Sequence, residues 1–195
     1  MVWALLGSTT LTSAADVITV SGFTAKEHLV VQVKGIGTGG TINCNFTFNS
    51  DTGNNYAIRE SVNGGSDSTN HSQANTDNLT GTVTGNVYAV VTITNISNKE
   101  KLFLSEGMEV ASGAGNAPER KELVGKWANT SSSITQIKAN NGGSGSYDTG
   151  SYITVFGATG DTVTDTTDNN SIFEENDTGK HYIWNATSDS WTEIP

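Results

Sequence analysis

Five aromatic side chains are the residues of this sequence best suited to binding. They are Trp127, Tyr147, Tyr182, Trp184 and Trp191. A Trp or Tyr ring can stack on a sugar ring or pack against a neighbouring subunit, with one polar group left for a hydrogen bond. We expect Trp127, in a strand-like run, to lie in the core or an interface, and Tyr147, in a Gly-rich loop, to be exposed. We expect Trp184 and Trp191 to hold a terminal hairpin against a neighbour.

Groups that could perform catalysis do not gather in the sequence. The three histidines, His28, His71 and His181, lie in unrelated contexts. Glycoside hydrolysis needs two carboxylates about 5–10 Å apart, and no such pair stands out. Neither a serine-nucleophile motif nor a phosphate-binding loop is present. We therefore expect no catalytic residues, no cofactor and no enzymatic activity.

Oxygen ligands suitable for calcium occur in two places. Asp161, Asp165 and Asp168 recur in one acidic segment, and Asn49 and Asp51 lie in a predicted turn. Neither group has the ligand spacing of an EF-hand loop. A solvated acidic segment accounts for the first group more simply, so no metal site is predicted.

The charge balance argues against several classes of partner. The chain carries 10 basic and 20 acidic residues, a formal net charge of −10. Because a phosphate backbone would be repelled, nucleic-acid binding is not expected.

No apolar run approaches the length of a membrane span, so no membrane partner is expected. Residues 2–6 are too short for the apolar part of a signal peptide and follow no Lys or Arg, so they predict a first strand and no export signal.

The composition favours β-structure. Val, Ile and Thr number 55, whereas Leu numbers only 8. β-branched side chains are stiff at χ1 and suit a pleated sheet. Runs of such residues alternate with Gly-, Asn- and Ser-rich turns along the chain. This pattern predicts an all-β fold, a jelly-roll-like antiparallel β-sandwich with a C-terminal β-hairpin appendage.

Periodicity and charge divide the chain into three predicted parts. Residues 1–157 form the sandwich, 158–171 a Thr/Asp/Asn linker and 172–195 the C-terminal hairpin segment. The strands of the sandwich are predicted over residues 2–6, 17–20, 29–33, 41–48, 56–62, 81–96, 101–111, 119–127, 133–139 and 152–157. Residues 63–78 contain no strongly apolar side chain and are predicted to be a long exposed loop.

Two of these strands carry further expectations. The run over residues 41–48 alternates strictly and places Cys44 on its apolar face, so Cys44 is expected to be a small core residue. The run over residues 81–96 is apolar on both faces, which is typical of a central strand packed on two sides.

Several short motifs stand out in the second half of the chain. The sequence reads KWANTS at residues 126–131, ITQI at 134–137 and GSYITVFG at 150–157. These motifs resemble a β-sandwich module that recurs in tail-fibre-like and other structural proteins of tailed bacteriophages. The sequence DTGKHYIW at residues 177–184, followed by Trp191, resembles a short hairpin appended to many viral fibre and virion proteins.

The resemblance implies a non-enzymatic virion structural protein, either a capsid-decorating or a tail- or fibre-associated subunit on the particle surface. It implies a homotrimer that also contacts other virion proteins. Lacking an export signal, the chain would reach the exterior as part of the assembled particle. The alternative is a carbohydrate-binding module that recognises host surface glycan through the five aromatic residues.

Overall fold

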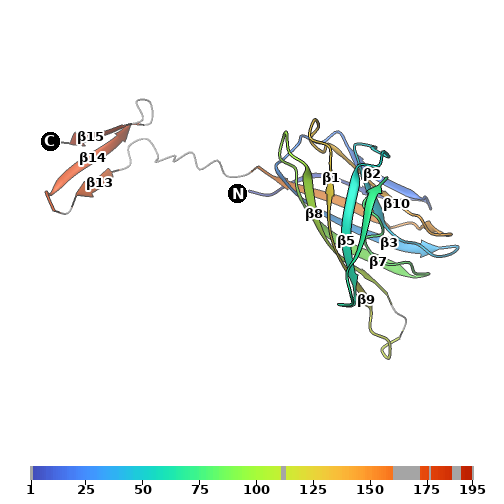
Figure 1. The fold of residues 1–195 in the computed structure, drawn as a ribbon. Coiled ribbons are helices and arrows are strands. Elements are labelled where there is room, and N and C mark those ends of the chain that lie inside the picture. Colours follow the sequence, from blue (N-terminus) through green and yellow to red (C-terminus); the bar gives the residue numbers. More distant parts are fainter. Residues whose placement is uncertain (1, 111–112, 160–171, 176, 186–189, 195) are drawn as a thin grey trace. The chain divides into compact units, whose positions relative to one another are not determined.

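The computed structural model describes residues 2–110, 113–159, 172–175, 177–185 and 190–194. These residues form β-strands and no helix, which confirms the all-β fold (Figure 1). The chain divides into two compact units, residues 1–160 and 161–195. The strands of the first unit are β1 (Ala4–Thr10), β2 (Val17–Ser21), β3 (His28–Thr38), β4 (Asn45–Phe48), β5 (Tyr56–Val62), β6 (Ser68–Gln73), β7 (Asn86–Thr94), β8 (Lys101–Glu109), β9 (Glu119–Trp127), β10 (Gln136–Asn140), β11 (Ser146–Tyr147) and β12 (Tyr152–Ala158).

The first unit contains two antiparallel sheets. The larger one has nine strands in the order β1-β12-β3-β7-β8-β9-β5-β6, with β11 paired to β3. The smaller one has the order β2-β10-β4. Residues 75–83 extend it beside β4, because the Thr76 amide donates to the Phe46 carbonyl at 3.0 Å and the Leu79 amide to the Cys44 carbonyl at 2.6 Å.

With this segment counted as a strand, the connections are those of a jelly roll. The first four strands of the large sheet, β1-β12-β3-β7, face β2-β10-β4 and residues 75–83. All but one of the connections between these eight strands cross from one sheet to the other, and the result is two sheets joined in Greek-key fashion. The predicted jelly-roll-like sandwich is therefore confirmed.

One continuous core fills the space between the sheets. It runs in sequence from Ile18 to Val155 and includes the inward residues of β3, β7 and β12, because alternate side chains of a strand face the same side. Towards β5 and β9 the core becomes aromatic. Phe48 lies 5.9 Å, between ring centroids, from each of Tyr56, Phe103 and Trp127. Cys44 is fully buried, as predicted, and burial raises the pKa of its thiol to about 12, although a hydrogen bond with Tyr147 opposes the rise.

Strands β8, β9, β5 and β6 widen the large sheet beyond the jelly roll. The prediction of a loop throughout residues 63–78 is wrong, because β6 lies within it. β6 is an edge strand of exposed polar residues held by its pairing with β5, so it shows no apolar alternation in the sequence. Beneath this part of the sheet, buried Lys121 pairs with Glu60 at 2.7 Å.

The second unit contains a small sheet of three strands. They are β13 (Ile172–Glu175), β14 (Lys180–Asn185) and β15 (Ser190–Ile194), in that order. The sequence predicted the pair β14 and β15, and β13 is an additional strand that pairs with β14. Most of the predicted linker, residues 160–171, lies outside the described residues.

Candidate functional site

The outer face of the large sheet carries a row of nonpolar side chains. The strand register aligns Leu104 of β8 with Val124 of β9 and Thr92 of β7. The same alignment continues through β3 and β12 to β1. We call the aligned residues, five nonpolar side chains and one threonine, the apolar row: Leu5, Phe156, Val30, Thr92, Leu104 and Val124.

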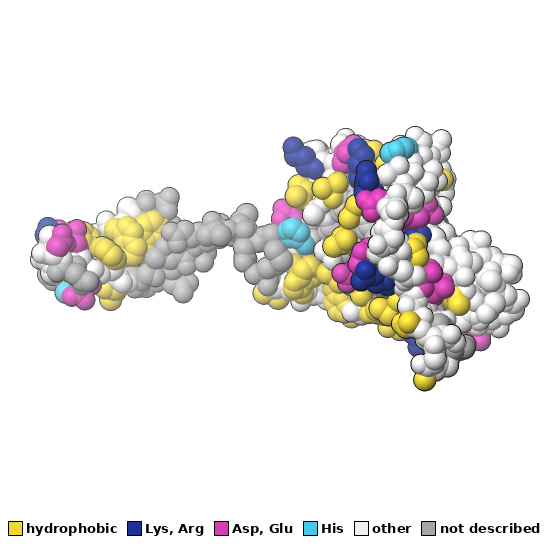
Figure 2. Space-filling model, turned by 60° about the horizontal axis from the view of Figure 1, so that its bottom comes forward, with side chains coloured by type: hydrophobic (Ala, Val, Ile, Leu, Met, Phe, Trp, Pro, Cys, Tyr) yellow, Lys and Arg dark blue, Asp and Glu magenta, His cyan; other side chains and the backbone are white. Residues whose placement is uncertain are grey.

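Much of the apolar row is open to solvent. The exposed fractions are 62% for Leu5, 48% for Leu104 and 49% for Val124, and Leu102 beside them is 55% exposed. Exposed hydrophobic side chains are visible among charged ones on the larger unit (Figure 2). Contiguous exposed nonpolar surface of this kind marks an interaction site more often than scattered single residues do.

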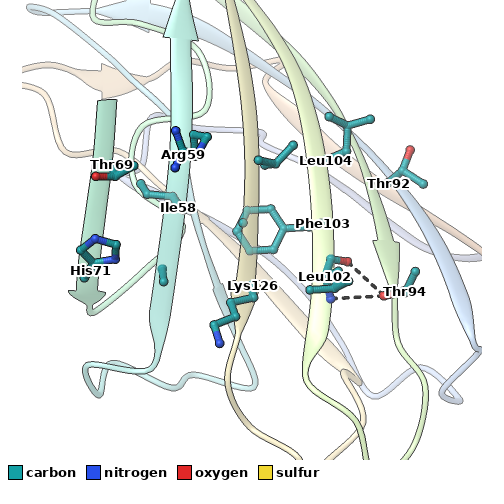
Figure 3. A pocket seen from close by; sticks show the side chains of 13 residues that line it. Ile58, Arg59, Thr69, His71, Thr92, Thr94, Leu102, Phe103, Leu104 and Lys126 are labelled. Carbon is teal, nitrogen blue, oxygen red and sulfur yellow. Dashed lines mark hydrogen bonds between the residues drawn. The ribbon is translucent and has the colours of Figure 1, made fainter. Parts of the chain in front are cut away.

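A pocket of about 600 Å³ lies where the row crosses β8 and β9. In Figure 3, Leu102 and Leu104 follow each other along β8, Thr92 and Thr94 lie on one side, and His71 lies on β6 at the other. Gly125 also lines the pocket, and it leaves room for the ring of Phe103, because a Cβ at this position would stand 2.4 Å from that ring. The lining is predominantly nonpolar, with Arg59 and Lys126 as its cationic members.

Charged residues of both signs flank the apolar row. On one side, Lys126 pairs with Glu100 at 2.8 Å. On the other side, Glu106 of β8 and Glu122 of β9 lie directly opposite each other, a like-charge arrangement that destabilises a sheet. Glu122 has Arg120 at 3.7 Å, whereas Glu106 has no ion-pair partner among the described residues.

The second candidate surface is one face of the C-terminal sheet. Opposed and alternate residues of its strands place Phe173, Tyr182, Trp184 and Trp191 on the same side. The ring centroids of Trp184 and Trp191 are 5.2 Å apart, and those of Phe173 and Trp191 are 6.0 Å apart. Phe173 is 52% exposed and Trp191 43% exposed, so the rings form an accessible aromatic face.

The structure therefore brings together three of the five aromatic residues singled out in the sequence, Tyr182, Trp184 and Trp191, and adds Phe173. Phe173 lies in the strand β13 that the sequence did not predict. The local sequence signal for Phe173 is weak, a phenylalanine followed by two glutamates.

Trp127, the fourth of the five, is a core residue with no exposed ring face. Its indole N–H donates to Asp51 Oδ2 at 2.7 Å. The same carboxylate accepts from the Asn55 amide at 2.9 Å and from the Gly53 backbone at 2.8 Å. Burial opposes ionisation, but the hydrogen bonds outweigh it and lower the pKa of Asp51 below its ordinary value. The turn over residues 49–55 is thereby tied to β9.

Replacing Asp51 by Asn should lower the free energy of unfolding by about 1–2 kcal/mol at neutral pH, because charge-assisted hydrogen bonds are lost. The folded-state pKa of Asp51 lies below its unfolded value, so this stabilisation is present above about pH 4 and disappears as the pH falls through the folded-state pKa. Urea unfolding of both proteins between neutral and acid pH measures the difference. A difference that stays constant down to acid pH would contradict this role of the carboxylate.

Tyr147, the fifth residue, was expected to be exposed, and this is wrong. The side chain is fully buried, and its hydroxyl donates to the Asn43 carbonyl at 2.7 Å. Room for the ring exists because residue 35 is a glycine, where a Cβ would stand 2.9 Å from the tyrosine ring. Neither Tyr147 nor Trp127 offers a surface to a sugar or a subunit.

The candidate polar residues do not assemble into a site in the part of the chain that the structure describes. No three His, Cys, Asp or Glu side chains there gather closely enough to hold a metal ion. Asp51 is engaged by Trp127, and Asp161, Asp165 and Asp168 lie outside the described residues. Of the histidines, His71 lines the pocket on the large sheet and His181 lies 3.9 Å from Glu174.

Comparison with known proteins adds no relative. No protein-family model matches the chain. No curated protein and no solved structure matches it either. The described residues contain no helix long and nonpolar enough to cross a membrane.

Proposed function

We propose that this chain is a non-enzymatic structural subunit of a tailed-virus particle, on the capsid surface or associated with the tail or a fibre. The observation that carries the proposal is the uncovered apolar row on the outer face of the large sheet. The jelly-roll fold and the resemblance of residues 126–137 and 150–157 to phage virion modules support it. In this proposal the chain functions by assembly, first with copies of itself and then with other virion proteins.

The nonpolar character of the face supports a subunit contact. Burial of one Leu or Val side chain stabilises a contact by roughly 1.5–3 kcal/mol. The fairly apolar run over residues 81–96 was expected to be packed on two sides, and this is wrong, because among the described residues only its inner face is covered by a second layer. A contact through the apolar row would supply the missing layer.

The charges of the same face favour a second copy of the chain as the partner. Glu106 and Glu122 lie on one side of the row and Lys126 on the other, and Arg59 of β5 lies in register with Val124 at the end of the row. Because the face carries both signs, copies brought together by rotation can set the acidic side of one against the basic side of the next. The resemblance to phage modules favours three copies.

The proposed location on a particle is tested by quantitative mass spectrometry of purified virions that encode the chain. The expected result is that the protein is present in multiple copies per particle, in a number divisible by three. Its absence from washed particles would refute the proposal.

A second candidate function is recognition of a host surface glycan, and the aromatic face of the C-terminal sheet favours it. Exposed Tyr and Trp rings suit stacking on sugars. A glycan array probed with the intact protein and with Trp184→Ala tests it. Binding that the substitution abolishes would support a receptor-binding role, whereas no binding to any glycan would leave assembly as the function.

Removing residues 161–195, which form the second unit, separates the two roles. The core cluster lies wholly within the first unit, between Ile18 and Val155. The truncated chain should therefore unfold with an unchanged midpoint and keep the oligomeric state of the intact chain, while binding to host cells is lost. Thermal unfolding, light scattering and a cell-binding assay measure these properties. Loss of the oligomer on truncation would show that the C-terminal sheet, and not the apolar row, holds the subunits together.

A further inference from the structure

A pocket of about 300 Å³ opens on the aromatic face of the C-terminal sheet. Its lining consists of three aromatic residues and one acid: Phe173, Tyr182, Trp191 and Glu175. The residues come from all three strands, since Phe173 and Glu175 belong to β13, Tyr182 to β14 and Trp191 to β15.

The rings stand at angles to one another instead of forming one flat platform. Phe173 and Tyr182 have centroids 6.2 Å apart and planes inclined by 35°. Phe173 and Trp191 have centroids 6.0 Å apart and planes inclined by 58°. Since their strands flank β14 on opposite sides, these two rings must meet above it. Inclined rings present several π faces to one small space, whereas stacking on a sugar uses one flat face.

The acid of the pocket is held in place by two hydrogen bonds. Glu175 Oε2 accepts hydrogen bonds from the Thr178 hydroxyl at 2.5 Å and from the Tyr182 hydroxyl at 3.5 Å. Lys180 lies directly opposite Glu175 and interacts with its charge, but the ammonium group forms its ion pair with Glu193 at 3.0 Å. Two carboxylates and one lysine on this face leave it with a net negative charge. No ion pair joins Glu175 to a basic group among the described residues of this sheet.

The wider charge of the segment has the same sign. Residues 172–195 contain five carboxylates and a single lysine. His181 and its neighbour Glu174 lie on the opposite face, because they alternate with Tyr182 and Glu175 along their strands. A cation is therefore favoured at the pocket over an anion.

We propose that this pocket binds a quaternary ammonium group of the choline type. The faces of Trp, Tyr and Phe rings attract a cation through their quadrupoles, and an alkylated ammonium has a nonpolar surface that fits against them. It also carries no N–H donors, so the pocket needs no further acceptors. A protonated amine would leave such donors unsatisfied among the rings. The inference rests on the second candidate function, surface recognition through the aromatic face, and names the chemistry recognised.

The test is calorimetric titration of the intact chain with choline chloride and with 3,3-dimethylbutanol, its uncharged analogue of the same shape. Choline is expected to bind at least about tenfold more tightly than the alcohol, because only choline gains the cation–π attraction. Equal affinities, or no detectable binding of choline, would overturn the proposal.

Substitutions locate the binding. Glu175→Gln keeps the shape of the side chain and should weaken choline binding several-fold, and Trp191→Ala should abolish it. The matched control is Glu174→Gln, which removes the adjacent charge on the opposite face and should leave the affinity unchanged. Equal weakening by the two glutamine variants would refute the site. A chain that binds array glycans but not choline would refute this inference alone, whereas one that binds neither would refute glycan recognition as well.

Discussion

Replacing Leu104 by Glu should weaken self-association of the intact chain by at least about thirtyfold. Leu104 lies in the apolar row between Thr92 and Val124 and lines the pocket. In a subunit contact the new carboxylate would be buried without a partner. We therefore expect the free energy of association to fall by at least as much as it does when an interface hot spot is removed. The fold of the monomer should persist, because the side chain is 48% exposed.

A matched control is available on the other sheet. Val17 is 43% exposed and lies on the outward side of β2. Val17→Glu introduces the same charge at a similar exposure but away from the apolar row, and it should leave association intact. Sedimentation velocity over a concentration series measures both variants. If Val17→Glu dissociates the protein and Leu104→Glu does not, the subunit contact lies on the smaller sheet and not on the apolar row.

Replacing Gly107 by Ala should destabilise the protein by about 3 kcal/mol or more. A Cβ at this position of β8 would stand 1.8 Å from the carbonyl oxygen of Leu79. The obstacle is backbone, so no side-chain rotation relieves it. The segment over residues 75–83 would have to move off β8, and with it one edge of the smaller sheet.

Gly85→Ala provides the control for this substitution. The nearest atom to a Cβ there is 3.8 Å away, an ordinary contact, and φ is not positive. Its effect should be within about 1 kcal/mol, because the alanine mainly reduces the entropy of the unfolded chain. Chemical denaturation compares the two. Similar stabilities for both variants would show that residues 75–83 do not pack on β8.

Local patterning was enough to predict most strands. The alternation of residues 56–62 and 119–127 predicted β5 and β9 with the bounds observed. Strand β6 was missed because its residues are polar, and its strand conformation depends on pairing with β5. Pairing with a neighbouring strand leaves no periodic signal in an edge strand whose two faces are both polar.

The binding surfaces depended still more on long-range geometry. Alternation along β8 separates Leu102 and Leu104 from Phe103, but it does not reveal which side is covered. The apolar row exists only through the register of six strands. The burial of Tyr147 also depends on a residue far away in the sequence. Its ring belongs to a Gly-rich loop and is buried because Gly35 leaves room for it. Trp184 and Trp191 lie opposite each other in the hairpin that the sequence did predict, because a short hairpin is a local structure.

The mass of the intact, unmodified chain in solution tests most directly whether copies of the chain assemble with one another through the apolar row. Native mass spectrometry at micromolar concentration should give three times the 20.5 kDa of one chain. A dimer would retain the subunit contact and refute the trimer. A monomer at this concentration would contradict the account, because the apolar row would then be exposed without forming a contact between copies.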